Sequence, residues 1–145
     1  MDLDSIIKTL NEKRYAQNEV LTEEERSVLN IYTPENRLIV YGTLAPNKPN
    51  HRVVEHIRGT WFEGIVKGKL ESKGWGAALG YNGFKPATIE EQQLIKAYIL
   101  FSNELVANWQ MLDEFEGNGY KRIFAKFELE NGDVGIGNIY ALNDE

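Results

Sequence analysis

The sequence LIVYGTLAPN at residues 38–47 begins as an apolar run and ends as a turn-rich segment. Residues 38–41 are a short run of the kind that forms a buried strand. Gly42 ends this run, because glycine adopts backbone conformations that other residues avoid. The prolines and asparagines that follow disfavour both a helix and a continued strand. A strand that feeds a polar loop can hold backbone N–H groups toward an anion. We therefore predict a binding loop here, although the loop alone does not identify its ligand.

From residue 37 onward, short apolar runs alternate with glycine and turn residues. The pattern predicts a helical turn at 53–57 and strands at 37–41, 60–70, 93–101, 120–129 and 134–142. Asn131-Gly132, between the last two runs, is a strong signal for a β-hairpin. Residues 74–84 are rich in glycine and favour a bent strand or a pocket-lining loop. Strands that come largely as hairpins predict an α+β fold with a mixed, strongly curved sheet or a small barrel.

Residues 1–36 have a helical pattern instead, and we predict an N-terminal helical extension to a domain at residues 37–145. The first helix would bury one apolar face, formed by Leu3, Ile6, Ile7 and Leu10. Thr22 and Glu25 have the spacing of a capping box ahead of a second short helix that ends near Ile31. Both helices are expected to pack at the edge of the core, with a role in binding a partner as the alternative.

Composition excludes several classes of function. The net charge of −6 argues against nucleic acid as a partner, because phosphate binding requires clustered lysine and arginine. No apolar run approaches the length of a membrane span. The first residues, MDLD, lack the basic start and apolar middle of a signal peptide, so we expect a soluble cytoplasmic protein. The oligomeric state is not indicated.

The chain has no cysteine and only two histidines, His51 and His56. A thiolate nucleophile and a cysteine-based zinc site are therefore excluded, and neither histidine belongs to a metal-binding pattern. We expect no metal and no cofactor. His51 is expected to bond the loop backbone, with a catalytic role as the alternative.

A predicted helix at residues 104–115 would direct one carboxylate inward. Ser102 or Asn103 can cap its start, and glycine follows its end. At about 100° per residue, Leu105, Trp109 and Leu112 form the buried stripe, and Glu116 is the next position on the same stripe.

Burial, the negative end of the helix dipole and nearby acids would all raise the pKa of Glu116. A carboxyl group tuned in this way suits general acid–base catalysis near neutral pH. The alternative is a carboxylate that pairs with Lys121 or Arg122, or one that is solvated past the last turn.

Three motifs together resemble the γ-glutamylcyclotransferase superfamily, and most of all its γ-glutamylamine cyclotransferase and AIG2-like branch. They are YGTL at 41–44, PNHRV at 49–53, and LDEFEG at 112–117 followed by YxR at 120–122. The resemblance covers about residues 37–142. It implies a small mixed β-barrel with a pocket between the YGTL loop and a catalytic glutamate, which Glu116 matches. Tyr41, Gly42, Thr43 and Leu44 would line the pocket, and their backbone would bind the α-carboxylate of a γ-glutamyl group.

The implied substrate is a small molecule, a γ-glutamyl amine or peptide. Its own α-amino group attacks its own γ-carbonyl, and the products are 5-oxoproline and an amine. No protein nucleophile is needed, which suits a chain without cysteine. The segment APN at 45–47 departs from the basic residue and glycine that often follow YGTL in the closest branch, and this leaves the choice between amine and peptide open.

Further residues are candidates for the pocket, and several of them have a structural role as the alternative. Arg122 could hold a substrate carboxylate, anchor Glu116, or form a structural ion pair. Tyr120 and Tyr140 could bind substrate or pack in the core. Trp75, Gly76, Tyr81 and Asn82 could line the leaving-group side. Two other functions stay open: a binding module that keeps the pocket without turnover, and a related enzyme that cleaves another γ-glutamyl or acyl-amine bond.

Overall fold

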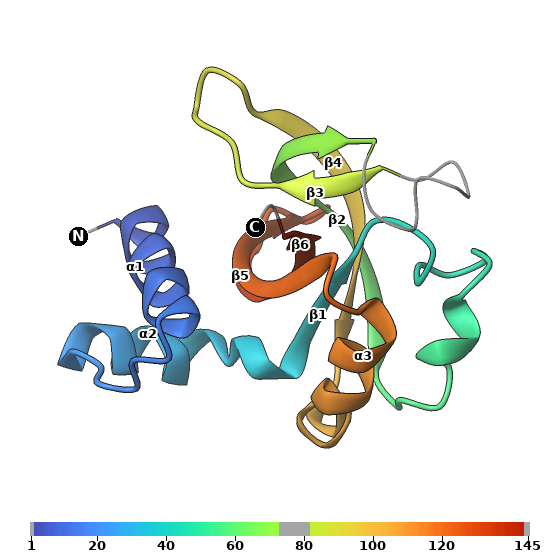
Figure 1. Cartoon of the computed structure of the whole chain (residues 1–145), viewed down its shortest axis with the longest axis horizontal. Helices are drawn as coiled ribbons and strands as arrows, with labels where there is room; N and C mark the ends of the chain where they lie inside the picture. The colour runs from blue at the N-terminus through green and yellow to red at the C-terminus, as the bar shows by residue number, and fades with distance from the viewer. Residues whose placement is uncertain (1, 73–81, 144–145) are drawn as a thin grey trace.

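A closed β-barrel forms the centre of the protein in the computed structural model, which describes residues 2–72 and 82–143 (Figure 1). The strands are β1 (Arg37–Val40), β2 (Thr60–Glu71), β3 (Gly83–Lys85), β4 (Gln93–Phe101), β5 (Tyr120–Leu129) and β6 (Val134–Leu142). The pairs β1–β4, β4–β2, β2–β5, β5–β6 and β6–β1 close five strands into a ring, and β3 adds to β2 and β6. Because β1 and β6 are parallel and most other pairs antiparallel, the predicted α+β fold with a small mixed barrel is confirmed.

Residues 38–40 of β1 are buried on both faces, which explains why all three are apolar, whereas Arg37 at the start of the strand is only partly buried. Ile39 points into the barrel interior, where it packs with residues such as Ile99 and Ile139. Leu38 and Val40 point the other way, into a second core cluster that includes Leu112. Successive side chains of a strand point to opposite faces, so a strand with core on both sides has no polar position.

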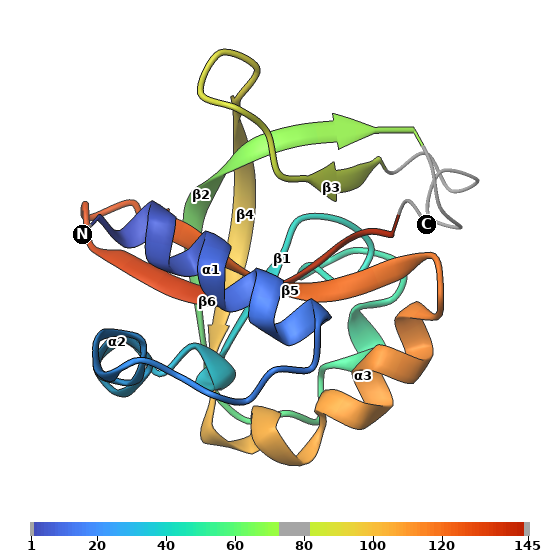
Figure 2. The same cartoon turned by 60° about the vertical axis from the view of Figure 1, so that its left-hand side comes forward.

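Two N-terminal helices, α1 (Leu3–Tyr15) and α2 (Glu23–Tyr32), lie on one side of the barrel. The predicted apolar face of α1 packs with Val28, Phe124 and Ile136 in a third core cluster, and Figure 2 shows α1 lying across β5 and β6. Asn11 bonds the backbone of Phe124 twice, by accepting from its N–H at 2.8 Å and donating to its carbonyl at 2.9 Å. The predicted capping box of Thr22 and Glu25 is present at the start of α2.

The predicted continuous helix at 104–115 is wrong. The segment consists of a 3-10 helix (Asn103–Ala107) and a separate α-helix, α3 (Trp109–Glu116). They meet at Asn108, whose side-chain amide donates to the Glu104 carbonyl at 2.8 Å and thereby competes with the regular helical bonding. Ser102 caps the start of the 3-10 helix, as predicted for one of the two candidates.

Smaller differences concern the ends of elements. The strand predicted at 37–41 ends at Val40, and the helical turn predicted at 53–57 is a 3-10 helix at His51–Val53. The strand predicted at 60–70 includes one more residue, and those at 93–101, 120–129 and 134–142 have the predicted bounds. Of the glycine-rich stretch at 74–84, residues 74–81 lie outside the described residues.

Candidate active site

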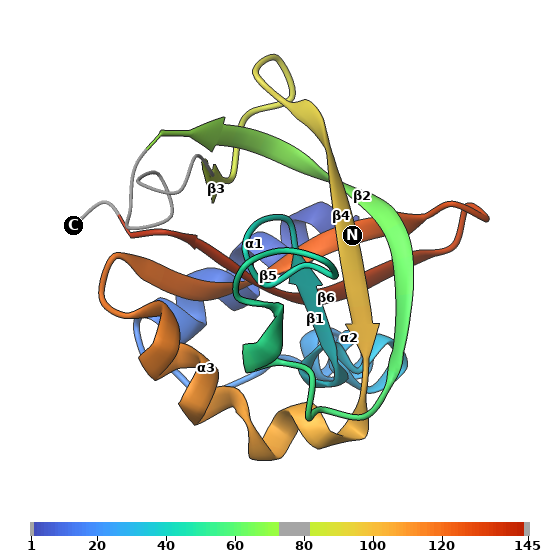
Figure 3. The ribbon, with the colours of Figure 1, turned by 90° about the vertical axis from the view of Figure 1, so that its right-hand side faces the viewer.

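A pocket opens where β1 and α3 end. Figures 1 and 3 show α3 and the segment after β1 on the side of the barrel away from α2. The pocket is lined by Ile39, Val40, Tyr41, Gly42, Thr43, Leu44, Asn82, Glu116, Tyr120 and Tyr140. The YGTL loop, the inward glutamate and both candidate tyrosines are therefore brought together, whereas Arg122 is not among the lining residues. Asn82 lies in the wall, and Trp75, Gly76 and Tyr81 lie outside the described residues.

Glu116 is the last residue of α3 and completes a stripe of apolar side chains. Leu105, Trp109 and Leu112 are all buried, in the spacing expected for that stripe. Burial raises the pKa of Glu116 from 4.5 to about 7, because removal from water disfavours the charged form. Burial is the cause that the described part of the chain provides for this rise, whereas we had also expected contributions from the helix dipole and from neighbouring acids.

Both basic residues proposed as alternative partners of Glu116 are directed elsewhere. The Lys121 ammonium lies 5.5 Å from the centre of the Tyr15 ring. Arg122 donates from Nε to Asp113 Oδ1 at 2.9 Å and from a terminal nitrogen to Asp113 Oδ2 at 3.4 Å. Among residues 2–72 and 82–143, those that line the pocket include no lysine or arginine.

Gly117 ends α3 directly after Glu116. Its φ of 77° and ψ of −173° fall in a region that is essentially restricted to glycine. Its N–H donates to the Asp113 carbonyl at 3.0 Å, which closes the last turn of the helix. This turn fixes the backbone from which the Glu116 side chain enters the pocket.

The YGTL loop is anchored at several points. The Tyr41 hydroxyl donates to the Tyr140 carbonyl at 2.7 Å and accepts from the Phe84 N–H at 2.8 Å, so it connects the end of β1 with β6 and β3. Burial raises the pKa of Tyr41 far above its ordinary value. His51 Nδ1 lies 2.8 Å from the Leu44 carbonyl oxygen, which confirms the expected bond to the loop backbone.

The loop also presents backbone donors. Ala45 donates to the Gly42 carbonyl at 3.1 Å, and Asn50 donates to the Thr43 carbonyl at 2.9 Å. In the part of the chain that the structure describes, no acceptor faces the N–H groups of Gly42, Thr43 and Leu44. Consecutive backbone N–H groups of this kind form concave sites for anions.

Tyr140 connects the pocket to Asp113, a contact that the sequence analysis missed. Its hydroxyl donates to Asp113 Oδ1 at 2.6 Å. Burial and this hydrogen bond raise the pKa of Tyr140 well beyond its ordinary range, so the phenol keeps its proton. Arg122 pairs with Asp113 and is not among the lining residues, which favours the structural ion pair among the roles considered for it. No signal in a single sequence pairs residues on a helix and a strand that lie this far apart in the chain.

Within residues 2–72 and 82–143, histidine, aspartate and glutamate form no group of three or more that could hold a metal ion. Over the same residues, every helix falls short of the length and apolarity needed to cross a membrane.

A family model described as gamma-glutamyl cyclotransferase, AIG2-like matches residues 38–145. The chain belongs to this family. No curated protein sequence matches the chain.

Solved structures share the fold. A mouse AIG2-like protein superposes with a TM-score of 0.57 at 22% identity, over 76% of this chain and 78% of that one. YkqA from Bacillus subtilis superposes with a TM-score of 0.56 at 25% identity, over 74% of this chain. The present chain spans only 36% of the length of YkqA. A yeast γ-glutamyl cyclotransferase specific to glutathione superposes with a TM-score of 0.50 at 11% identity, over 72% of this chain and 67% of that one.

Proposed function

We propose that this protein cyclises the γ-glutamyl group of a γ-glutamyl amine or peptide to 5-oxoproline and releases the amine, with Glu116 as the general acid–base. One observation carries the proposal: a carboxyl group with a pKa of about 7 lies in the same pocket as a loop with available backbone donors. Proton transfer by a side chain is most effective when its pKa is near the working pH.

The loop is proposed to bind the α-carboxylate of the substrate. Among the described residues that line the pocket there is no lysine or arginine, and the backbone N–H groups of Gly42, Thr43 and Leu44 are available to face a carboxylate. A carboxylate held there would bring the adjacent α-amino group into the space between the loop and Glu116. The hydroxyl of Tyr41 is committed to two backbone partners, and we assign it to shaping this loop.

The proposed reaction needs one proton to be relayed. The α-amino nitrogen attacks the γ-carbonyl carbon, and a new C–N bond closes the five-membered ring. Glu116 accepts the proton that the attacking nitrogen loses. It then delivers that proton to the leaving nitrogen as the old amide C–N bond breaks. Atoms and charges balance without a protein nucleophile or a co-reactant.

Positioning and proton transfer can supply the rate. Well-oriented intramolecular reactions gain up to about 7–11 kcal/mol from positioning alone. A placed general base adds about 10²–10⁴-fold. A small pocket that folds one flexible substrate onto itself uses both effects.

The test is a screen of γ-glutamyl amines and γ-glutamyl dipeptides for release of 5-oxoproline by the purified protein. Glu116→Gln is expected to abolish release while the thermal unfolding transition is retained. The matched control is Glu114→Gln, because Glu114 lies on the same helix with an exposed side chain and outside the pocket. Release that survives Glu116→Gln would overturn the assigned role.

A binding module without turnover is the competing hypothesis, and the same screen separates the two. It predicts that γ-glutamyl compounds raise the melting temperature while no 5-oxoproline forms. The cytoplasmic location, the independence from cofactors and the domain boundary at residues 36 and 37 stay predictions.

A further inference from the structure

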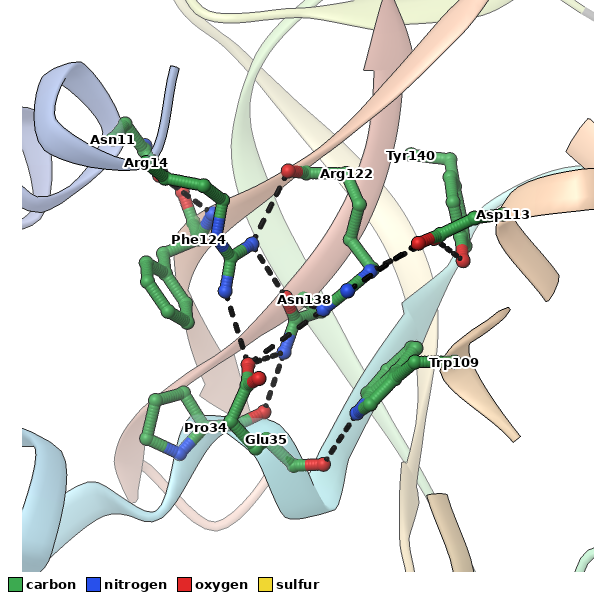
Figure 4. Close-up of polar contacts among 10 residues, drawn as sticks. All are labelled: Asn11, Arg14, Pro34, Glu35, Trp109, Asp113, Arg122, Phe124, Asn138 and Tyr140. Atoms are coloured by element: carbon green, nitrogen blue, oxygen red, sulfur yellow. Dashed lines mark hydrogen bonds and ion pairs between the residues drawn. The ribbon is translucent and has the colours of Figure 1, made fainter. Parts of the chain in front are cut away.

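A cluster of polar side chains joins the N-terminal extension to the wall of the pocket (Figure 4). It contains two arginines and two carboxylates around one fully buried amide, and its members are Arg14, Glu35, Asp113, Arg122 and Asn138. The cluster ends at Tyr140, whose hydroxyl donates to Asp113. It therefore connects α1, which lies outside the family match, with a residue that lines the pocket.

Arg14 makes three polar contacts in this cluster. Its guanidinium donates to Glu35 Oε1 at 3.0 Å, to Asn138 Oδ1 at 2.8 Å and to the Arg122 carbonyl at 3.1 Å. It also lies 3.7 Å from the centre of the Phe124 ring. A planar guanidinium suits this position because it offers several donors in a fixed arrangement and can stack on an aromatic ring.

Arg122 lies between two carboxylates. It binds Asp113 through two nitrogens, and another of its nitrogens lies 3.7 Å from Glu35 Oε1. Arg14 approaches the same Glu35 oxygen more closely, at 3.0 Å. As long as Arg14 neutralises Glu35, Arg122 can keep its bidentate contact with Asp113. Without Arg14, Arg122 would be the nearest cation to Glu35 among the described residues. Glu35 would then attract Arg122 away from Asp113.

We propose that Arg14 is a positioning residue for the pocket. By neutralising Glu35, it keeps Arg122 on Asp113 and the Asp113 carboxylate on the hydroxyl of Tyr140. The N-terminal extension thus helps to orient a wall of the candidate active site, in addition to covering the barrel. Only the kinetic part of the test below rests on the proposed function.

The test compares Arg14→Gln with Lys13→Gln. Lys13 is the neighbouring cation on α1 and pairs with Glu25 of α2, outside the cluster. Both variants lose one positive charge and one ion pair of the same helix, so a general loosening of α1 would affect them alike. A third variant, Arg14→Gln combined with Glu35→Gln, removes the carboxylate that would compete for Arg122.

The first readout does not depend on activity. In protein labelled with ¹³C at the ζ carbon of tyrosine, the Tyr140 resonance is assigned by its loss in Tyr140→Phe among the seven tyrosines. We expect Arg14→Gln to shift this resonance, Lys13→Gln to leave it in place, and the double variant to restore it. No shift in Arg14→Gln, or an equal shift in all three variants, would overturn the proposal.

The second readout is kinetic and uses a γ-glutamyl compound that the wild-type protein cyclises. Arg14→Gln is expected to lower kcat by about threefold to tenfold, in the range found for residues coupled in one network. KM should change little, because the cluster adjoins Tyr140 and not the loop that would hold the carboxylate. The double variant should recover most of kcat. A loss that Glu35→Gln does not relieve would contradict the proposal.

If Arg14→Gln does not fold, Arg14→Met carries the same test. Methionine keeps a long side chain beside the Phe124 ring but removes the charge that neutralises Glu35. The Tyr140 resonance should then shift, and Glu35→Gln should again relieve the shift. A Tyr140 resonance that Arg14→Met leaves in place would count against the proposal.

Discussion

The pocket and the polar cluster each receive a carboxylate from α3, Glu116 and Asp113 respectively, and the two carboxylates have different surroundings. In the cluster, the carboxylates of Asp113 and Glu35 face the guanidinium groups of Arg122 and Arg14. In the pocket, Glu116 lies one helical turn from Asp113, the described lining residues include no lysine or arginine, and burial raises the pKa of Glu116 to about 7. Paired charges stabilise the cluster, whereas a carboxyl group whose pKa is raised by burial can exchange a proton near neutral pH. Four predictions test this contrast.

The largest effect is expected for Glu116→Gln, which should separate activity from stability. Loss of the general base should lower kcat for 5-oxoproline release by about 10²–10⁴-fold. Glutamine has a similar shape and no charge to bury, so the free energy of unfolding above pH 7 should stay the same or rise. Enzyme assays and urea unfolding at pH 8 measure the two quantities. A large loss of stability would mean that Glu116 belongs to the scaffold.

Stability should also depend on pH through Glu116. Its carboxyl pKa is 4.5 in the unfolded chain and about 7 in the folded protein, so the folded state binds more protons between these values. The free energy of unfolding therefore falls as pH rises from about 4.5 to about 7, by up to about 3 kcal/mol.

Urea unfolding over this range should show that the free energy of unfolding of the wild type falls relative to that of Glu116→Gln as pH rises. Equal pH profiles of the two proteins would remove the basis for a raised pKa of Glu116.

By the same titration, kcat/KM of the wild type should rise with pH through about 7, as Glu116 becomes able to accept a proton.

Gly117→Ala should strain the turn that directs Glu116 into the pocket. The φ and ψ angles of Gly117 are essentially restricted to glycine, and such strain costs of order 1–3 kcal/mol. We expect a corresponding loss of stability and a fall in kcat. Gly119→Ala is the matched control, since its φ is not positive and an added Cβ would meet no atom within 4 Å. Equal effects of both substitutions would contradict this explanation.

The smallest effect is expected for Asp113→Asn. The Asp113 side chain is 45% exposed, so its pair with Arg122 is screened by solvent and should contribute about 1 kcal/mol or less. Unlike Glu116→Gln, this substitution should lower the free energy of unfolding, and the loss should shrink at high salt. Urea unfolding at low and high salt measures it. An increase in stability would break the distinction between the two carboxylates of α3.

Local patterns allowed much of the fold to be predicted. Three strands have the predicted bounds because alternation over nine or ten residues is a strong signal and the Asn131-Gly132 hairpin turn separates the last two. The capping box of α2 is encoded within four residues. The helix at 104–115 was predicted wrongly because its break at Asn108 depends on a side-chain bond that periodicity does not reveal.

For the candidate site, too, local features could be predicted from the sequence and contacts between distant segments could not. The sequence by itself determined that YGTL follows a buried strand and that Glu116 continues the apolar stripe of a helix, because both depend on neighbours within one or two turns. Only the tertiary structure decided that these two segments meet in one pocket, since barrel closure brings β1 beside β6 and the end of α3. It also decided the partner of Arg122. The guanidinium of Arg122 pairs with the carboxylates that the fold places next to it. These are Asp113 of α3 and Glu35 of the segment before β1.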